Sequence, residues 1–160
     1  MEASWIAAKG HTEPQKSGNH LLWIVDSGAS RHITYDHRAF SDFQGLIEPI
    51  SITTASGLML QGTGQGIVAL EINIDGAKRA IALTEVLYVP GLAGSLISVF
   101  QLQDRGIIVR TTIISGASSS SSSLLIERYG RTIGVTERLG KAYALKTAIG
   151  GALQAIEDPI

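Results

Sequence analysis

The stretch WIVDSGASRHIT, residues 23–34, decides the expected fold, because an apolar run ends abruptly at a single carboxylate. The run 21–25 has the composition of a short buried strand. Asp26 follows this strand directly, where an ordinary turn would also accept an aspartate. The residues after it are all small and allow a close approach of backbone or ligand: Ser27, Gly28, Ala29 and Ser30.

Paired carboxylates offer the chemistry that a lone aspartate lacks. Two carboxyl groups in one site repel each other, so one keeps its proton as an acid while the other acts as a base. The triplet Asp-Ser-Gly occurs once, and the second carboxylate is therefore expected from a second copy of the chain across a two-fold axis. The other candidate acids are interpreted as surface or capping residues: Asp36, Asp42, Asp75 and Asp104.

Composition limits the classes of protein that need to be considered. The chain has 160 residues, 44% of them hydrophobic and 17% charged, which indicates one globular domain. A net charge of −1 gives no reason to expect nucleic acid as a partner. The absence of cysteine excludes disulfides, cysteine nucleophiles and zinc knuckles. No apolar stretch has the length of a membrane span, and the first residues do not resemble a signal peptide, so no membrane association is expected.

Alternation and turn signals predict a mostly β domain with many hairpins. A turn is expected at Asp75-Gly76 and a helix over 95–105, begun by Ser95 and ended by Gly106. The glycine-dotted run GTGQG, residues 62–66, and the serine tract 115–123 are expected to be flexible. The expected organisation is a linker or polyprotein-derived lead-in over 1–19, a domain over 20–148 and a tail over 149–160.

Three other kinds of site find less support in the sequence. A Ser/His/Asp set could combine Ser27 or Ser30 with a nearby histidine, but the pattern G-x-S-x-G of serine hydrolases is absent. His32, His37 and Asp36 lack the rest of a metal-binding set, and His32 is expected to pack or hydrogen-bond beside the loop. GTGQG lacks the lysine and the following helix of a phosphate-binding loop. No metal or cofactor is therefore expected.

Four stretches resemble the protease domain of Ty1/copia-type retrotransposon polyproteins, a group of retropepsin-like aspartic proteases. They occur in the family's order over about residues 20–147 and read WIVDSGASRHIT (23–34), DHRAF (36–40), VLYVPGLAGSLISVFQLQDRG (86–106) and GKAYAL (140–145). The resemblance implies a closed β-barrel of the acid-protease fold with one short helix, active as a homodimer. It departs from the retropepsin pattern near PGLAGS, where a hydrophobic-hydrophobic-Gly element is expected before the helix, and at the serine tract.

The resemblance also implies roles for residues of this chain. Asp26 becomes the catalytic aspartate, Ser27 and Gly28 complete the active-site triplet, and the loop extends through Ala29 and Ser30. The implied flap over the substrate consists of Thr54, Ala55, Ser56 and Gly57. The implied substrate is the element's own Gag-Pol polyprotein, cleaved in the cytoplasm within virus-like particles. The alternative interpretation is a catalytically inactive module for dimerisation or peptide binding. A third interpretation is a monomeric precursor that folds fully only when it pairs with a second copy.

Overall fold

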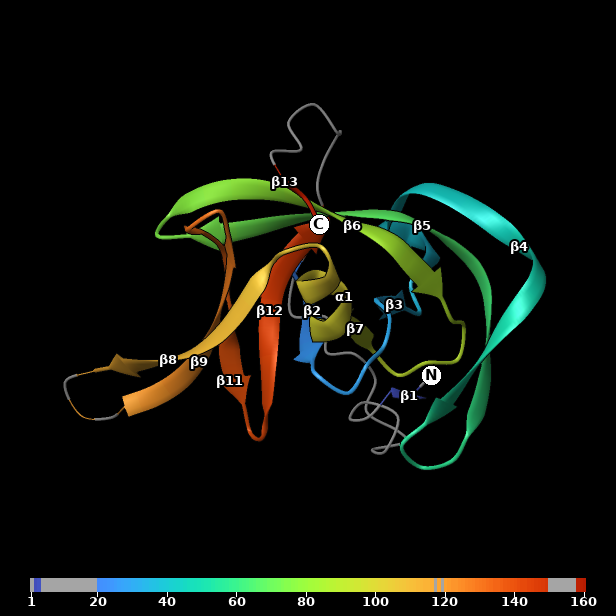
Figure 1. Ribbon diagram of the computed structural model, residues 1–160, viewed down its shortest axis with the longest axis horizontal. Coiled ribbons are helices and arrows are strands. Elements are labelled where there is room, and N and C mark those ends of the chain that lie inside the picture. Colours follow the sequence, from blue (N-terminus) through green and yellow to red (C-terminus); the bar gives the residue numbers. More distant parts are fainter. Residues whose placement is uncertain (1, 4–19, 117, 119, 150–157) are drawn as a thin grey trace.

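The computed structural model describes residues 2–3, 20–116, 118, 120–149 and 158–160. Within these residues the chain is mainly β with one short α-helix, α1, at Val99–Asp104, and a single 3₁₀ turn at His37–Ala39 (Figure 1). The strands are β1 Glu2–Ala3, β2 His20–Asp26, β3 Ile33–Thr34, β4 Phe40–Thr54, β5 Met59–Ile74, β6 Ala77–Tyr88, β7 Ser95–Ser98, β8 Ile108–Ser115, β9 Ser120–Arg128, β10 Arg131–Val135, β11 Glu137–Leu139, β12 Ala142–Ile149 and β13 Asp158–Pro159.

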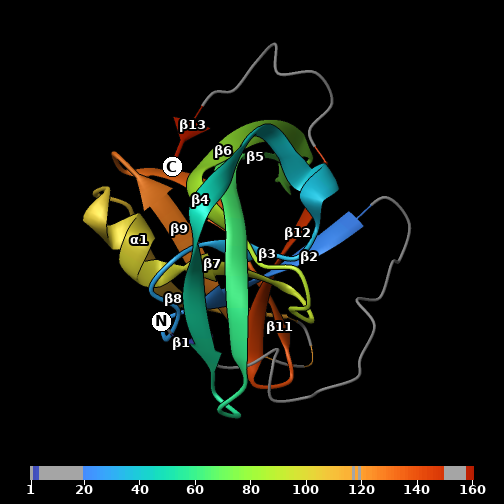
Figure 2. The ribbon, with the colours of Figure 1, turned by 90° about the vertical axis from the view of Figure 1, so that its right-hand side faces the viewer.

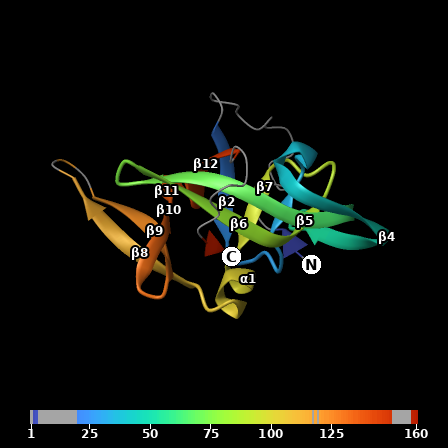
Figure 3. The ribbon, with the colours of Figure 1, turned by 90° about the horizontal axis from the view of Figure 1, so that it is seen from above.

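Strand pairing among the described residues gives two sheets. The larger sheet follows the order β1-β4-β5-β12-β2-β7-β3-β6-β13, with β11 on β12 and an additional pairing of β5 with β6. The smaller sheet, β10-β9-β8, extends away from the larger one (Figure 3). The expected mainly β class with one short helix is confirmed, whereas the closed barrel and the homodimer remain predictions.

Strand β2 lies in the interior of the larger sheet, between antiparallel β12 and parallel β7. Successive side chains of a strand point to opposite faces. Accordingly, Trp23 and Val25 pack in one hydrophobic cluster, while Ile24 packs in a second cluster on the other face. Burial on both faces explains why the sequence before Asp26 is a continuous apolar run rather than an alternating one.

The helix is shorter than the sequence predicted, and its start was wrong. Residues Ser95–Ser98 form β7, which pairs with Trp23–Asp26, and the cap of α1 is Ser98 instead of Ser95. All four β7 residues are buried, so pairing with β2 outweighs local helix preference. Within the helix, Phe100 is exposed and Leu102 is buried. The stop at Gly106 is confirmed by its positive φ of 76°.

The GTGQG run is not a flexible segment but part of β5. Its glycines face neighbours that leave no room for a side chain. A Cβ on Gly62 would lie 2.6 Å from Leu87 side-chain carbon atoms, and one on Gly64 would overlap the Phe43 ring. Gly66 faces the Asp42 carbonyl of the paired strand β4. Close strand approach, rather than flexibility, therefore explains these glycines.

Gly66→Ala is expected to lower the free energy of unfolding by about 1–3 kcal/mol, because the new methyl group forces the β4 backbone away. A Cβ there would lie 2.9 Å from the Asp42 carbonyl carbon and 3.0 Å from Phe43 Cα. Urea denaturation measures the change. Gly45→Ala is the matched control, since its Cβ would meet nothing within 4 Å. Equal losses in the two variants would contradict the close-approach explanation.

The serine tract also differs from its expected flexible form. Ser120 to Ser123 belong to β9 and pair with Ser115 to Thr112 of β8, so part of the tract is regular strand. Ser123 is buried, and its hydroxyl donates to the Thr136 carbonyl oxygen. Residues 117 and 119 lie outside the described residues. Pairing with β8 supplies an order that serine composition alone does not indicate.

The predicted turn and the described ends of the chain belong to the larger sheet. The Asp75-Gly76 hairpin is confirmed, with φ values of 51° and 80° that suit a tight two-residue turn. Most of the predicted lead-in, residues 4–19, and most of the predicted tail lie outside the described residues. The described ends pair with the larger sheet: β1 with β4 and β13 with β6. No helix in the described part of the chain is long and apolar enough to cross a membrane.

Candidate active-site loop

Asp26 is the last residue of β2 and lies in register with Ser98, the last residue of β7. Its side chain is largely buried, with 9% of the residue exposed. The Gly28 backbone N–H donates to Asp26 Oδ1 at 2.7 Å, which turns the loop back over the carboxylate. Ser27 and Gly28 are exposed, so the loop is accessible beside a carboxylate that is held in place.

Ser98 connects this loop to the start of helix α1. Its hydroxyl donates to the Ala29 carbonyl oxygen at 2.6 Å and accepts from the Gln101 backbone N–H at 3.0 Å. The second bond caps the helix, as serine commonly does. The element before the helix thus reads Leu96-Ile97-Ser98, and serine stands where the retropepsin resemblance leads us to expect glycine.

His32 lies on the buried side of the same loop, with no exposed surface. Its Nδ1 accepts the Ser98 backbone N–H at 2.9 Å, and its own backbone N–H donates to Gln101 Oε1 at 2.9 Å. Burial, together with the positive charges of Arg105 and Arg31, lowers the pKa of His32 from 6.5 to about 3. The ring is therefore neutral at ordinary pH, and the expectation that His32 packs and hydrogen-bonds beside the loop is confirmed.

Sequence reasoning missed the roles of Ser98 and Gln101, although their spacing carried a signal. Ser-x-x-Gln is the pattern of a capping box, in which the glutamine side chain normally returns to the N–H of the cap residue. Here the His32 ring accepts the hydrogen bond from the Ser98 N–H, and the Gln101 side chain accepts one from the His32 backbone N–H instead. A capping-box search would have found the start of the helix but not its connection to the Asp26 loop.

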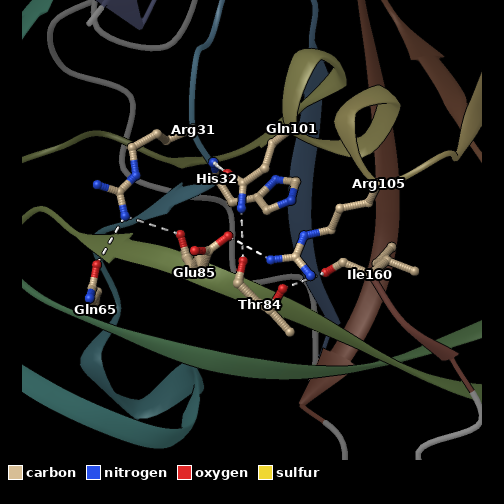
Figure 4. A network of polar contacts seen from close by, with 8 residues as sticks. All are labelled: Arg31, His32, Gln65, Thr84, Glu85, Gln101, Arg105 and Ile160. Carbon is tan, nitrogen blue, oxygen red and sulfur yellow. Dashed lines mark hydrogen bonds and ion pairs between the residues drawn. The ribbon is translucent and has the colours of Figure 1, made fainter.

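Outer contacts tie the loop to neighbouring strands (Figure 4). Gln101 Nε2 donates to the Thr84 carbonyl oxygen of β6 at 2.9 Å, so the glutamine lies between His32 and β6. Arg31 donates to Gln65 Oε1 of β5 at 3.1 Å. Arg105 pairs with the Glu85 carboxylate at 2.6 Å. The loop after Asp26 is thus held by the helix and by strands β5 and β6.

The predicted flap residues form the turn of the β4–β5 hairpin, which projects from the body of the domain (Figure 2). Thr54 is buried, whereas Ala55, Ser56 and Gly57 are exposed. The Thr54 hydroxyl accepts the Leu58 backbone N–H at 3.0 Å. In Figure 1 the turn of this hairpin lies apart from the end of β2.

Thr54→Val is expected to lower the free energy of unfolding by about 1 kcal/mol, because it removes the hydroxyl that accepts the Leu58 N–H inside the turn. Thermal unfolding measures the loss, and amide exchange at Leu58 locates it. Thr53→Val is the matched control, since Thr53 is exposed one position earlier. A loss that is the same in both variants would contradict a specific role for the Thr54 hydroxyl.

The other four candidate aspartates and His37 have ordinary structural surroundings. Asp36 is buried, caps the 3₁₀ turn and pairs with Arg38 at 2.9 Å, which confirms its interpretation as a capping residue. His37 is exposed and its ring contacts Phe43, with ring centroids 4.4 Å apart. The remaining three acids are exposed, as expected: Asp42, Asp75 and Asp104. Within the described residues, no three acidic or histidine side chains gather as a metal-binding group.

The fold and the loop define a mainly β domain in which one aspartate ends a strand that is buried over residues 23–26. The family described as "Pol polyprotein, beta-barrel domain" matches residues 23–107, from the strand before Asp26 to the end of the helix region. The chain belongs to this family. The match includes the Asp26 loop, the β4–β5 hairpin and α1.

Two curated relatives from Arabidopsis thaliana agree with this assignment. The chain is 35% identical over 80 residues to "Retrovirus-related Pol polyprotein from transposon RE2", covering 50% of this chain and 5% of the relative. It is 33% identical over 89 residues to the corresponding polyprotein from transposon RE1, covering 56% of this chain and 6% of the relative. No solved structure matches. The likeness to a retrotransposon Pol region is confirmed, and the protease identity remains a prediction.

Proposed function

We propose that this chain is the aspartic endopeptidase of a copia-type retrotransposon and acts as a homodimer. The observation that carries the proposal is the position of Asp26, which ends a strand buried on both faces and starts a loop anchored by Ser98. Such a loop holds a carboxylate in a fixed orientation while Ser27 and Gly28 stay exposed to a second copy.

In the proposed mechanism, two Asp26 carboxyl groups share one proton across a water molecule. The ionised carboxylate takes a proton from the water as the water oxygen attacks the scissile carbonyl carbon. The protonated carboxyl group gives its proton to the developing oxyanion. The tetrahedral intermediate then collapses and the C–N bond breaks, while the leaving nitrogen receives the proton that the first carboxylate removed from the water. This chemistry uses only side chains and water, so the proposal includes no metal or cofactor.

Features of the sheet and of the hairpin support the remaining parts of the proposal. Strand β5 pairs with both β12 and β6, and those two strands are also connected to each other through β2, β7 and β3. A ring of paired strands of this kind fits a barrel. Leu58 and Met59 beside the flap turn are 55% and 62% exposed and would offer apolar contact to an extended peptide. The proposed substrate is the element's own Gag-Pol polyprotein, within virus-like particles in the cytoplasm; nucleic acid and membranes take no part.

A cleavage assay over a range of protein concentrations tests the proposal. Peptides that span junctions of the parent polyprotein are incubated with the chain between mildly acidic and neutral pH, and products are identified by mass spectrometry. Activity is expected to rise faster than linearly with protein concentration where the dimer is weak, since each site needs two copies. The proposal fails if a sample shown to be folded and dimeric cleaves none of the peptides.

A catalytically inactive peptide-binding or dimerisation module is the second candidate. It is favoured by one observation, the presence of Ser98 at the position where the retropepsin resemblance leads us to expect glycine. The same peptides distinguish the two candidates. A module would bind them, or would dimerise, without any cleavage, and Asp26→Asn would leave that binding unchanged.

A further inference from the structure

The loop after Asp26 and the start of α1 are joined by four hydrogen bonds, three of which close a ring through Ser98, His32 and Gln101. The Ser98 N–H donates to His32 Nδ1, and the His32 N–H donates to Gln101 Oε1, both at 2.9 Å. The Gln101 N–H donates to Ser98 Oγ at 3.0 Å, and Ser98 Oγ donates to the Ala29 carbonyl oxygen at 2.6 Å. Two points of the loop, Ala29 and His32, are thereby attached to one helix cap.

His32 contributes to this ring in a way that an apolar side chain could not. Because Nδ1 accepts a hydrogen bond, the neutral ring carries its proton on Nε2. Nε2 is buried and has no hydrogen-bond partner within the described residues. An unpaired buried donor is unfavourable, so leucine would fill this space at a lower cost in free energy than histidine. The acceptor at Nδ1 is therefore the property that distinguishes histidine at this position.

The charges around the ring keep this acceptor available. Arg31, adjacent in the loop, and Arg105, at the end of α1, both oppose a positive charge on the ring. Glu85 of β6 pairs with Arg105 at 2.6 Å, so that carboxylate is already engaged. Figure 4 shows these side chains arranged around His32. A ring that stays neutral continues to accept the Ser98 N–H under the mildly acidic conditions in which paired carboxylates work.

We propose that His32 is a positioning residue for Asp26, acting through Ser98 and the Ala29 carbonyl to fix the active-site loop. The proposal rests on the proposed protease function for its catalytic consequence, although its structural part can be tested without activity. Ser98 lies beside Asp26 in the β2–β7 register, and the Gly28 N–H bonds to the carboxylate. Loss of the His32 acceptor would loosen both ends of the loop that orients this carboxylate.

The test compares His32→Leu with His32→Asn. Asparagine Oδ1 occupies the same position along its side chain as histidine Nδ1 and can accept the Ser98 N–H, whereas leucine cannot. His32→Leu is expected to lower kcat by about 10–100-fold with little change in KM, because misplacement of a reacting group acts mainly on the chemical step. His32→Asn is expected to regain most of kcat. His37→Leu, at an exposed histidine, is the control.

Amide hydrogen exchange supplies a second readout that does not require cleavage. The Gly28 and Ser98 amides are expected to exchange faster in His32→Leu and to approach the wild-type rates in His32→Asn. If the wild-type chain cleaves no peptide, the proposed function fails while the exchange rates still decide the role of His32. Unchanged exchange in His32→Leu, or equal losses in both variants, would overturn the proposal and leave a packing role alone.

Discussion

Asp26→Asn is expected to lower kcat/KM for peptide cleavage by about 10²–10⁴-fold, the usual contribution of a positioned acid–base group. The amide can neither accept the proton of the attacking water nor give one to the oxyanion. The fold is expected to persist, because the asparagine Oδ1 can still accept the Gly28 N–H that bonds to Asp26 at 2.7 Å. Steady-state kinetics on a polyprotein-derived peptide measure the loss, and thermal unfolding verifies that the variant is folded.

Two controls sharpen this experiment. Asp42→Asn makes the same chemical change at an exposed aspartate in β4 and should leave kcat/KM unchanged. At a protein concentration at which nearly all chains are dimeric, mixing wild-type chains with about a tenfold excess of Asp26→Asn chains should lower the activity per wild-type chain by roughly the same factor, since most wild-type chains then have an inactive partner. Undiminished activity in the mixture would contradict a site shared between two copies, and full activity of Asp26→Asn would refute the mechanism.

Acid is expected to destabilise the fold through His32. Burial and two nearby arginines lower its pKa from 6.5 to about 3, so below pH 6.5 the unfolded chain binds a proton that the folded chain does not. The free energy of unfolding should therefore fall as the pH falls, by about 1.4 kcal/mol per pH unit from this residue. The decline should level off near the folded-state pKa. Urea denaturation at a series of pH values measures it.

His32→Asn isolates this contribution, because asparagine does not titrate. The variant should show a shallower decline in stability with acid than the wild type, whatever its stability at neutral pH. His37→Asn changes an exposed histidine and should retain the wild-type slope. Identical slopes for the wild type and His32→Asn would mean that the folded protein accommodates a charged ring at this position. The expected result would favour proteolysis nearer to neutral pH than to strong acid.

The helix region illustrates where sequence reasoning ended. The pattern around residues 95–105 contained a helix, a serine cap and a glycine stop, and the structure contains all three. Four residues of the predicted helix, Ser95–Ser98, nevertheless form a strand, because they pair with the buried strand β2. Similarly, the glycines of residues 62–66 suggested flexibility, while the facing Leu87, Phe43 and Asp42 require their small size. Both differences arise from neighbours that are distant in the sequence.

The sequence predicts the mainly β class, the Asp75-Gly76 turn and the strand that ends at Asp26, because local patterns of apolar, small and turn-forming residues carry these features. It also carried the four stretches on which the resemblance to a retrotransposon protease rests. The position of Ser98 beside Asp26 and the burial of His32 against the helix cap emerge only from the folded chain. Those contacts join residues more than sixty positions apart, and hydrogen bonds between such residues depend on strand register, which no local pattern specifies.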